Sequence, residues 1–191
     1  MAREKETNKE DRIFEAALRI VVQQGFAGLK MSEVAKKAGV ATGTLYLYFE
    51  TKEDLIDKLY RSYKQANYEA LLAGYDTAGS FAERFKQLWY NYFNACFKDP
   101  LRMIFIEQYY RSPYLREETK KETGLLGQPV IDLLTEGIQE KTLRSLPVEL
   151  LIAQIISPIH ELVKLHFDKR LALTKPLVEQ CFAMCWDSVR S

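Results

Sequence analysis

The chain has 191 residues, of which 47% are hydrophobic and 28% charged, as in ordinary water-soluble proteins of one or two domains. Its net charge is +1, and residues 1–55 carry equal numbers of acidic and basic side chains, so bulk charge does not indicate a nucleic-acid binder. The three Cys form no disulfide framework, the charged N-terminal residues give no indication of a signal peptide, and no apolar run reaches the ~18 residues of a membrane span. We therefore expect a cytoplasmic protein without membrane contact.

Apolar residues recur along the chain with the period of amphipathic helices, and no segment alternates as a half-buried strand does. The first helix is predicted over residues 9–24, ending at Gly25, since glycine readily adopts the left-handed conformation after a helix. Two short helices follow within residues 31–49, and a longer one is predicted over residues 52–73. Because this last helix has no Gly or Pro before Gly74, we expect it to act as a rigid lever.

Proline and glycine residues divide the rest of the chain into further helices. They are predicted over residues 81–98, 101–112, 114–141, 147–168 and 174–190, with a break in the third of these near Gly124 and Gly127. The prediction is an all-α fold of about nine helices. It consists of an N-terminal three-helix domain over residues 1–50 and a helical bundle over residues 51–191.

The stretch MSEVAKKAGVATGTLYLYF, residues 31–49, is typical of a helix-turn-helix. Its first helix has one apolar face, Gly39 suits the C′ position, and Val40 is expected to fill the corner. In the second helix the inner side is predicted to hold Ala41, Leu45, Tyr48 and Phe49, and the outer arc Gly43, Thr44, Tyr46 and Leu47. Such a slim, uncharged arc suits a DNA groove, although a compact helical corner with a solvent-exposed second helix would show the same spacing.

The longer stretch GFAGLKMSEVAKKAGVATGTLYLYFETKEDL, residues 25–55, resembles the signature of the tetracycline-repressor (TetR) family. The residues that match in register are Ala35, Ala38, Gly39, Val40, Gly43, Leu45, Tyr46, Tyr48, Phe49, Lys52 and Leu55. The resemblance implies a helix-turn-helix DNA-binding domain over residues 1–50 and a ligand-binding and dimerisation domain over residues 51–191. By position, it implies DNA contacts from Ser32, Thr42, Gly43, Thr44, Tyr46, Tyr48 and Lys52. Where the family often has Ser, this chain has Ala41, so we expect Thr42 to cap the helix instead.

Residues 81–115 contain eleven of the 23 aromatic side chains of the chain. This concentration indicates either the wall of a pocket for an apolar or aromatic ligand or an ordinary aromatic core. The pocket interpretation places ligand contacts at Trp89, Tyr92, Phe93, Cys96, Phe105, Glu107, Tyr109 and His160, with Glu107 or His160 as a polar anchor.

The last two predicted helices carry more apolar positions than one chain is expected to cover. We therefore predict a four-helix homodimer interface from Leu151, Ile155, Ile159, Leu162, Leu177, Cys181, Met184 and Trp186, and Leu150 beside them. The two His and the pair Cys181 and Cys185 lack the pattern of a metal site, and no nucleophile motif or phosphate-binding loop is present. No cofactor, metal or enzymatic activity is expected.

Together, the residues and the resemblance predict a homodimeric repressor that binds a palindromic, double-stranded operator and is released by a small apolar or aromatic effector. The alternatives are a DNA-binding regulator that needs no ligand and a helical small-molecule binder without an operator.

Overall fold

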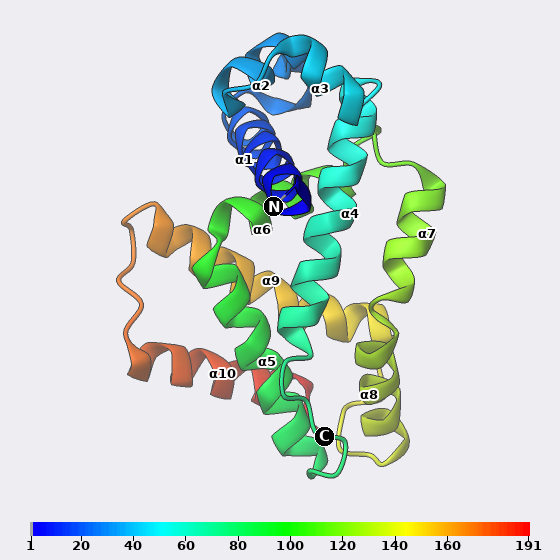
Figure 1. Cartoon of the computed structure of the whole chain (residues 1–191). Helices are drawn as coiled ribbons and strands as arrows, with labels where there is room; N and C mark the ends of the chain where they lie inside the picture. Colours follow the sequence, from blue (N-terminus) through cyan, green and yellow to red (C-terminus); the bar gives the residue numbers. More distant parts are fainter. Residues whose placement is uncertain (1) are drawn as a thin grey trace. The chain divides into compact units, whose positions relative to one another are not determined.

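The computed structural model describes residues 2–191, and their side chains from residue 9 onward. Over this range the chain forms ten α-helices and no strand longer than a single bridge between Leu143 and Arg190 (Figure 1). The helices are α1 (Ala2–Gly28), α2 (Met31–Ala38), α3 (Thr42–Tyr48), α4 (Lys52–Leu71), α5 (Phe81–Lys98), α6 (Pro100–Tyr110), α7 (Glu117–Leu125), α8 (Gln128–Gln139), α9 (Val148–Phe167) and α10 (Lys175–Val189). The all-α prediction is confirmed.

The described residues hold ten helices rather than about nine because the predicted helix over residues 114–141 is two helices, α7 and α8. They separate at the glycine pair that the sequence indicated as a break. Another difference is in α1, which begins at Ala2 instead of residue 9 and extends to Gly28 instead of residue 24. Gly25 interrupts α1 with a φ of +72°, as its position at the end of the predicted helix required. No helix in the described part of the chain is both long and apolar enough to cross a bilayer.

The chain divides into two compact units. Unit 1 contains the residues up to Lys64 together with Leu101–Lys121, and unit 2 contains Gln65–Pro100 and Glu122–Ser191. The predicted three-helix domain therefore lies within unit 1, which also takes in the first part of α4, α6 and the beginning of α7.

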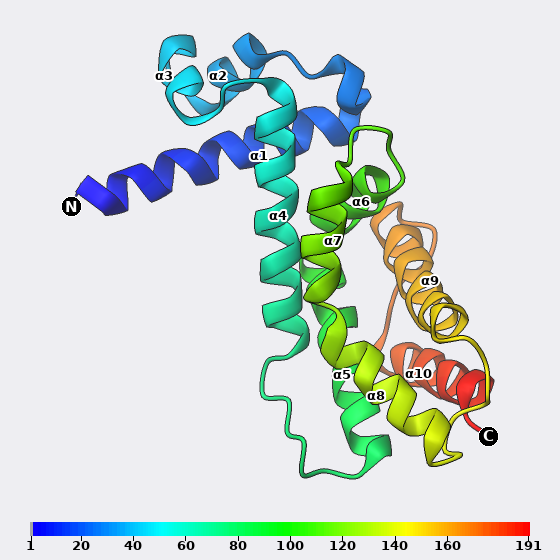
Figure 2. The same cartoon turned by 90° about the vertical axis from the view of Figure 1, so that its right-hand side faces the viewer.

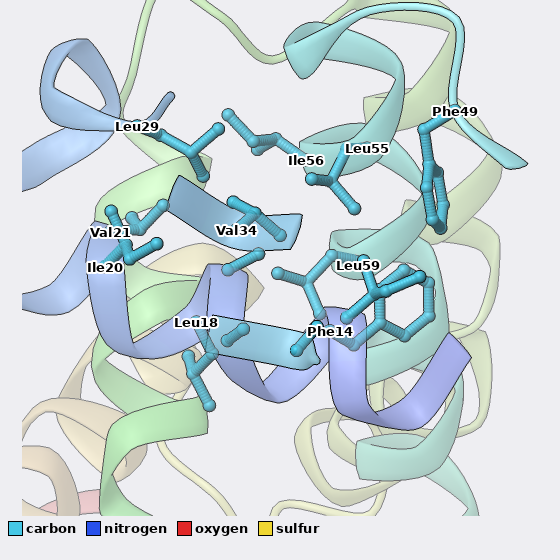
Figure 3. Packing of buried hydrophobic residues seen from close by; sticks show 14 of the residues in the cluster. Phe14, Leu18, Ile20, Val21, Leu29, Val34, Phe49, Leu55, Ile56 and Leu59 are labelled. Atoms are coloured by element: carbon cyan, nitrogen blue, oxygen red, sulfur yellow. The ribbon is translucent and has the colours of Figure 1, made fainter. Parts of the chain in front are cut away.

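The core of unit 1 joins α1, α2 and α4 (Figure 3). Phe14 from α1 lies beside Leu59 from α4, and these two side chains are buried, as are Leu18 from α1 and Val34 from α2. The apolar face predicted for α2 is confirmed, because Met31, Val34, Ala35 and Ala38 are its buried residues. This packing supplies most of the stability of helices that are too short to be stable alone.

A polar cluster and an aromatic cluster hold α6 and α7 onto the rest of unit 1. Asp57 is buried on α4, where its carboxylate accepts hydrogen bonds from Arg61 Nε at 2.8 Å and from the Thr119 hydroxyl at 2.7 Å. Arg61 Nη2 also donates to the Thr119 hydroxyl at 2.7 Å, which closes the triangle. Beside it, Tyr109 packs on Tyr60 with ring centres 4.9 Å apart. A buried carboxylate with these partners is satisfied, so the cluster fixes α7 against α4.

Unit 2 is built around α5, which packs against α8 and α9. Its start is fixed by a capping box, in which the Ser80 hydroxyl accepts from the Glu83 N–H and the Glu83 carboxylate accepts from the Ser80 N–H at 3.0 Å. The Ser80 hydroxyl also donates to the Glu83 carboxylate at 2.7 Å, and this bond together with the one from the Ser80 N–H lowers the pKa of Glu83. Phe85 then packs on Trp186 of α10 with ring centres 5.0 Å apart. The unit thus brings the aromatic helix and the last two helices into one core.

Candidate nucleic-acid interface

The corner between α2 and α3 is the helix-turn-helix that the sequence predicted. Gly39 has a φ of +66°, the left-handed conformation that favours glycine, and its N–H bonds back to the carbonyls of Ala35 and Lys36. The N–H of Val40 donates to Ala35 O at 3.0 Å, and its side chain packs against the core of unit 1. The left-handed glycine and the apolar residue after it therefore fix the direction in which α3 leaves the turn.

Two side chains attach α3 to the core, since Leu45 and Phe49 are both buried. Tyr48 is half-buried, but Ala41 is exposed, so its predicted place on the inner side is wrong. The prediction that Thr42 caps α3 is also wrong. The N-cap residue is Ala41, whose methyl side chain makes no cap hydrogen bond. Thr42 follows it and already lies within the first turn of the helix.

The outer arc of α3 is exposed and uncharged. Leu47 has 85% of its surface exposed and Tyr46 has 51%, large values for apolar side chains of this size. Thr42 and Gly43 are exposed as well, and a Cβ atom built at Gly43 would meet no atom within 4 Å. The arc therefore presents a slim backbone at its start and the exposed side chains of Tyr46 and Leu47 further along, which no described residue of the chain covers.

The other residues expected to contact DNA lie in the same unit. Ser32 is exposed near the start of α2, and Thr44 is half-buried on α3. Lys52 is the first residue of α4, with its Nζ 4.0 Å from Glu53 Oε1. Figures 1 and 2 show α2 and α3 side by side at the N-terminal end of α4. The structure thus brings the seven residues to one end of unit 1.

The residues expected to line a ligand pocket divide between the two units. Phe105, Glu107 and Tyr109 belong to α6 in unit 1, where the rings of Phe105 and Tyr109 fill the core and pack on Phe26, at 6.0 and 5.3 Å between centres. Both rings are therefore part of the core of unit 1. Glu107 is half-buried on the same helix.

The other five, Trp89, Tyr92, Phe93, Cys96 and His160, form a mixed aromatic and polar cluster in unit 2. The rings of Trp89 and Phe93 are parallel with centres 5.6 Å apart. The Tyr92 hydroxyl lies 2.7 Å from His160 Nε2, which joins α5 to α9. Burial raises the pKa of the Cys96 thiol to about 12, against the opposing hydrogen bond from Tyr92, so the thiol is neutral at physiological pH.

The residues expected at a dimer interface all lie on α9 and α10 but differ in exposure. Leu151 and Ile159 are buried inside unit 2. The half-buried ones are Ile155, Leu162, Leu177, Cys181 and Trp186, and Met184 has 73% of its surface exposed. Leu150 is also exposed. The apolar surface available to a partner is thus provided by part of the predicted set.

Comparisons with known proteins match both parts of the chain. The family model described as bacterial regulatory proteins, tetR family, matches residues 13–59, and the one described as tetracyclin repressor-like, C-terminal domain, matches residues 80–190. An uncharacterized HTH-type transcriptional regulator of Haemophilus influenzae is 29% identical over 118 residues, which is 62% of this chain and 63% of that relative. The fatty acid metabolism regulator protein of Bacillus subtilis is 29% identical over 155 residues, 80% of each protein.

Solved structures share the fold over nearly the whole chain. A TetR family transcription regulator from Marinobacter aquaeolei superposes with a TM-score of 0.92 at 24% identity and covers 99% of both chains. The transcriptional regulator FadR from Bacillus subtilis, solved in complex with stearoyl-CoA, superposes with a TM-score of 0.67 at 24% identity, over 91% of this chain and 94% of that one. At these identities the likeness shows the architecture.

Proposed function

The chain belongs to the TetR family of bacterial transcriptional regulators, and from this premise we propose that it is a homodimeric repressor that binds a palindromic operator and is released by an apolar small molecule. Its relatives are transcriptional regulators rather than enzymes. The observation that carries the DNA-binding half of the proposal is the outer arc of α3, which is exposed, uncharged and slim at its start. Such an arc lets the backbone of a helix approach the base edges of a major groove.

Within this proposal, a rim formed by Ser32, Tyr46, Tyr48 and Lys52 positions the protein on the DNA backbone, and the slim end of the arc reads bases. Ser32, Tyr46, Tyr48 and Lys52 supply hydroxyl and ammonium donors for phosphate oxygens. Thr42, Gly43 and Thr44 are at the slim end, where a threonine methyl suits the methyl group of thymine.

Substitutions at the rim and on the arc should have different effects on DNA binding. We expect Lys52→Ala and Tyr46→Phe to weaken binding to all sequences by similar factors, because phosphate contacts carry no sequence information. We expect Thr44→Ala to change the preference among operator variants instead. Binding is measured by fluorescence anisotropy on a duplex enriched from a random library by the wild-type protein, and on a scrambled duplex. If Lys52→Ala leaves both the affinity and its salt dependence unchanged, Lys52 is not at the DNA backbone.

For the effector, the cluster of Trp89, Tyr92, Phe93, Cys96 and His160 in unit 2 supports an apolar ligand with one polar group. Its rings offer apolar contact, and the pair formed by Tyr92 and His160 offers a hydrogen-bonding end. The Bacillus subtilis relatives, one a fatty acid metabolism regulator and one solved with stearoyl-CoA, favour a long acyl chain as the apolar part. The roles of Phe105, Glu107 and Tyr109 stay predictions.

The effector proposal is tested by release of the selected duplex. We expect stearoyl-CoA to release it from the wild type at micromolar concentration, and coenzyme A without an acyl chain to have no effect. The mild variant Tyr92→Phe should raise the concentration needed by about tenfold, the size of one lost hydrogen bond to a buried partner. It retains the ring, so the fold is preserved. If the same concentration of stearoyl-CoA releases the duplex from the wild type and from the variant, the effector binds elsewhere. If no acyl compound releases the duplex from the wild type, the ligand-independent alternative is favoured.

A further inference from the structure

The connection from α3 to α4 contains a polar arrangement that the proposed function does not use. α3 has only seven residues, and its last turn contains no basic side chain. The carbonyl groups at the end of a helix have no partners within it and carry partial negative charge, so they require donors from elsewhere. The C-terminal end of α3 therefore needs a donor from another element.

Lys58 supplies it from the second turn of α4. Its Nζ donates a hydrogen bond to Tyr48 O, the last carbonyl of α3, at 3.1 Å. The same ammonium lies 3.0 Å from Asp54 Oδ2 and 5.3 Å from the centre of the Phe49 ring. A cation ten residues along the chain thus sits at the negative end of α3 and over the aromatic side chain that attaches α3 to the core.

Asp54 connects this cation to the turn itself. Its Oδ2, which binds Lys58, also accepts the N–H of Glu50 at 3.1 Å. The N–H of Asp54 in turn donates to the Thr51 hydroxyl at 3.0 Å, as at a helix N-cap. The end of α3, the turn and the start of α4 are therefore held by one connected set of hydrogen bonds.

We propose that Lys58 is a positioning residue for DNA reading, which rests on the proposed function of α3 as the reading helix. From α4 it fixes the C-terminal end of α3, and with it the angle at which the outer arc meets the groove. Base contacts depend on that angle because the groups that make them must be held within a fraction of an ångström. Contacts to phosphates from the rim depend on it less, since a lysine there can adjust along its flexible stem.

The test compares Lys58→Met with Lys52→Ala on two DNA probes. The probes are the duplex that the wild type enriches from a random library and a scrambled duplex of the same length. Lys58→Met keeps most of the length of the side chain and removes both its charge and its hydrogen-bond donors. We expect it to weaken binding to the enriched duplex by about tenfold, the effect of one poorly placed base contact, and to leave binding to the scrambled duplex unchanged.

Salt dependence separates positioning from direct contact. A lysine that contacts a phosphate contributes about 0.9 to the slope of log affinity against log salt concentration. We expect Lys58→Met to keep the wild-type slope. Lys52→Ala should lower the magnitude of the slope by about 0.9, the contribution of one phosphate contact. Lys58→Arg should restore affinity, because it also places a cationic donor at the carbonyl. Lys120→Met, on α7, removes an exposed lysine whose Nζ lies 3.9 Å from Glu117 Oε1, and should bind both probes as the wild type does.

Two results would overturn the positioning role. One is a lowered slope with equal losses on both probes, which would make Lys58 a phosphate contact. The other is unchanged binding of Lys58→Met to the enriched duplex. If Lys58→Met folds poorly by its unfolding temperature, Asp54→Asn, which removes the ion pair and keeps an acceptor oxygen, is expected to show the same selective loss in weaker form. If the wild type enriches no duplex, the proposed function fails rather than this inference.

Discussion

Replacement of Gly43 by alanine is expected to stabilise the chain and, at the same time, to weaken its binding to the operator by about tenfold to a hundredfold, the size of one lost base contact. Glycine lowers the stability of a helix by up to about 1 kcal/mol relative to alanine. Gly43 is within α3 and exposed, and an added Cβ would meet nothing within 4 Å. Nothing in the described part of the chain therefore requires glycine at this position. A backbone that must approach DNA closely does require it.

Gly124 provides a matched control. It also lies inside a helix, α7, is exposed, and has open space where a Cβ would be placed. Gly124→Ala should give a similar small gain in unfolding temperature and leave operator affinity unchanged. The measurements are thermal unfolding followed by circular dichroism and titration of the enriched duplex. A Gly43→Ala protein that is more stable and binds as tightly as the wild type would show that the arc does not approach DNA at this residue.

The helix-turn-helix was predictable from the sequence because every signal for it is local. Gly39 and Val40 follow the apolar face of α2 within two residues, and their roles depend only on the turn itself. The boundaries of α5 were predictable for a similar reason. Ser80 and Glu83 start it with a capping box, and the Asp99-Pro100 pair ends it. Signals of this kind act between neighbours in the chain, so a single sequence contains them in full.

Signals that depend on burial were less complete. The start of α1 was predicted at residue 9, although the helix begins at Ala2, because its apolar periodicity begins only at Ile13. A hydrophobic period reports the face that is buried and gives no indication of turns that extend beyond it. The assignment of Ala41 to the inner side failed differently. It assumed helical geometry one residue before the helix starts, at an N-cap with extended φ and ψ.

Tertiary contacts were not predictable from the sequence. The aromatic residues of 81–115 form one dense group in the sequence, yet the chain passes from unit 2 to unit 1 between Pro100 and Leu101, so the group is divided between two cores. The contact of Lys58 with the carbonyl of Tyr48 was missed for a related reason. It depends on the angle between α3 and α4, which no pattern of residue types specifies. In the sequence, a lysine on the exposed side of a predicted helix gives the same pattern whether or not its ammonium group reaches a backbone oxygen in the fold.

The second large effect is expected at the proposed dimer interface. Met184 on α10 has 73% of its surface exposed, although most large apolar side chains of unit 2 are covered. Isolated exposed apolar residues are common, so the exposure alone identifies no interface. Its position among the half-buried apolar residues of α9 and α10 is what favours a second copy of this chain as the partner. The Gln154 Nε2 atom donates to the Ser188 hydroxyl at 3.4 Å, which shows that these two helices pack together and can present a joint surface.

We therefore expect Met184→Glu to convert the protein from a dimer to a monomer at micromolar concentration, as measured by sedimentation velocity. A carboxylate placed in an apolar interface must lose its hydration without a partner, which is costly. The monomer retains one reading head, so binding to the palindromic duplex should weaken by about 10²–10⁴-fold, the usual gain from linking two sites.

Leu125→Glu on α7 is the matched control, since Leu125 is also 73% exposed and lies outside the proposed interface. If both variants sediment as the wild type does, the interface is elsewhere. If both dissociate, the effect of Met184→Glu is one of added charge. If Met184→Glu alone is monomeric and still binds the palindrome as tightly as the wild type, then dimerisation does not set operator affinity.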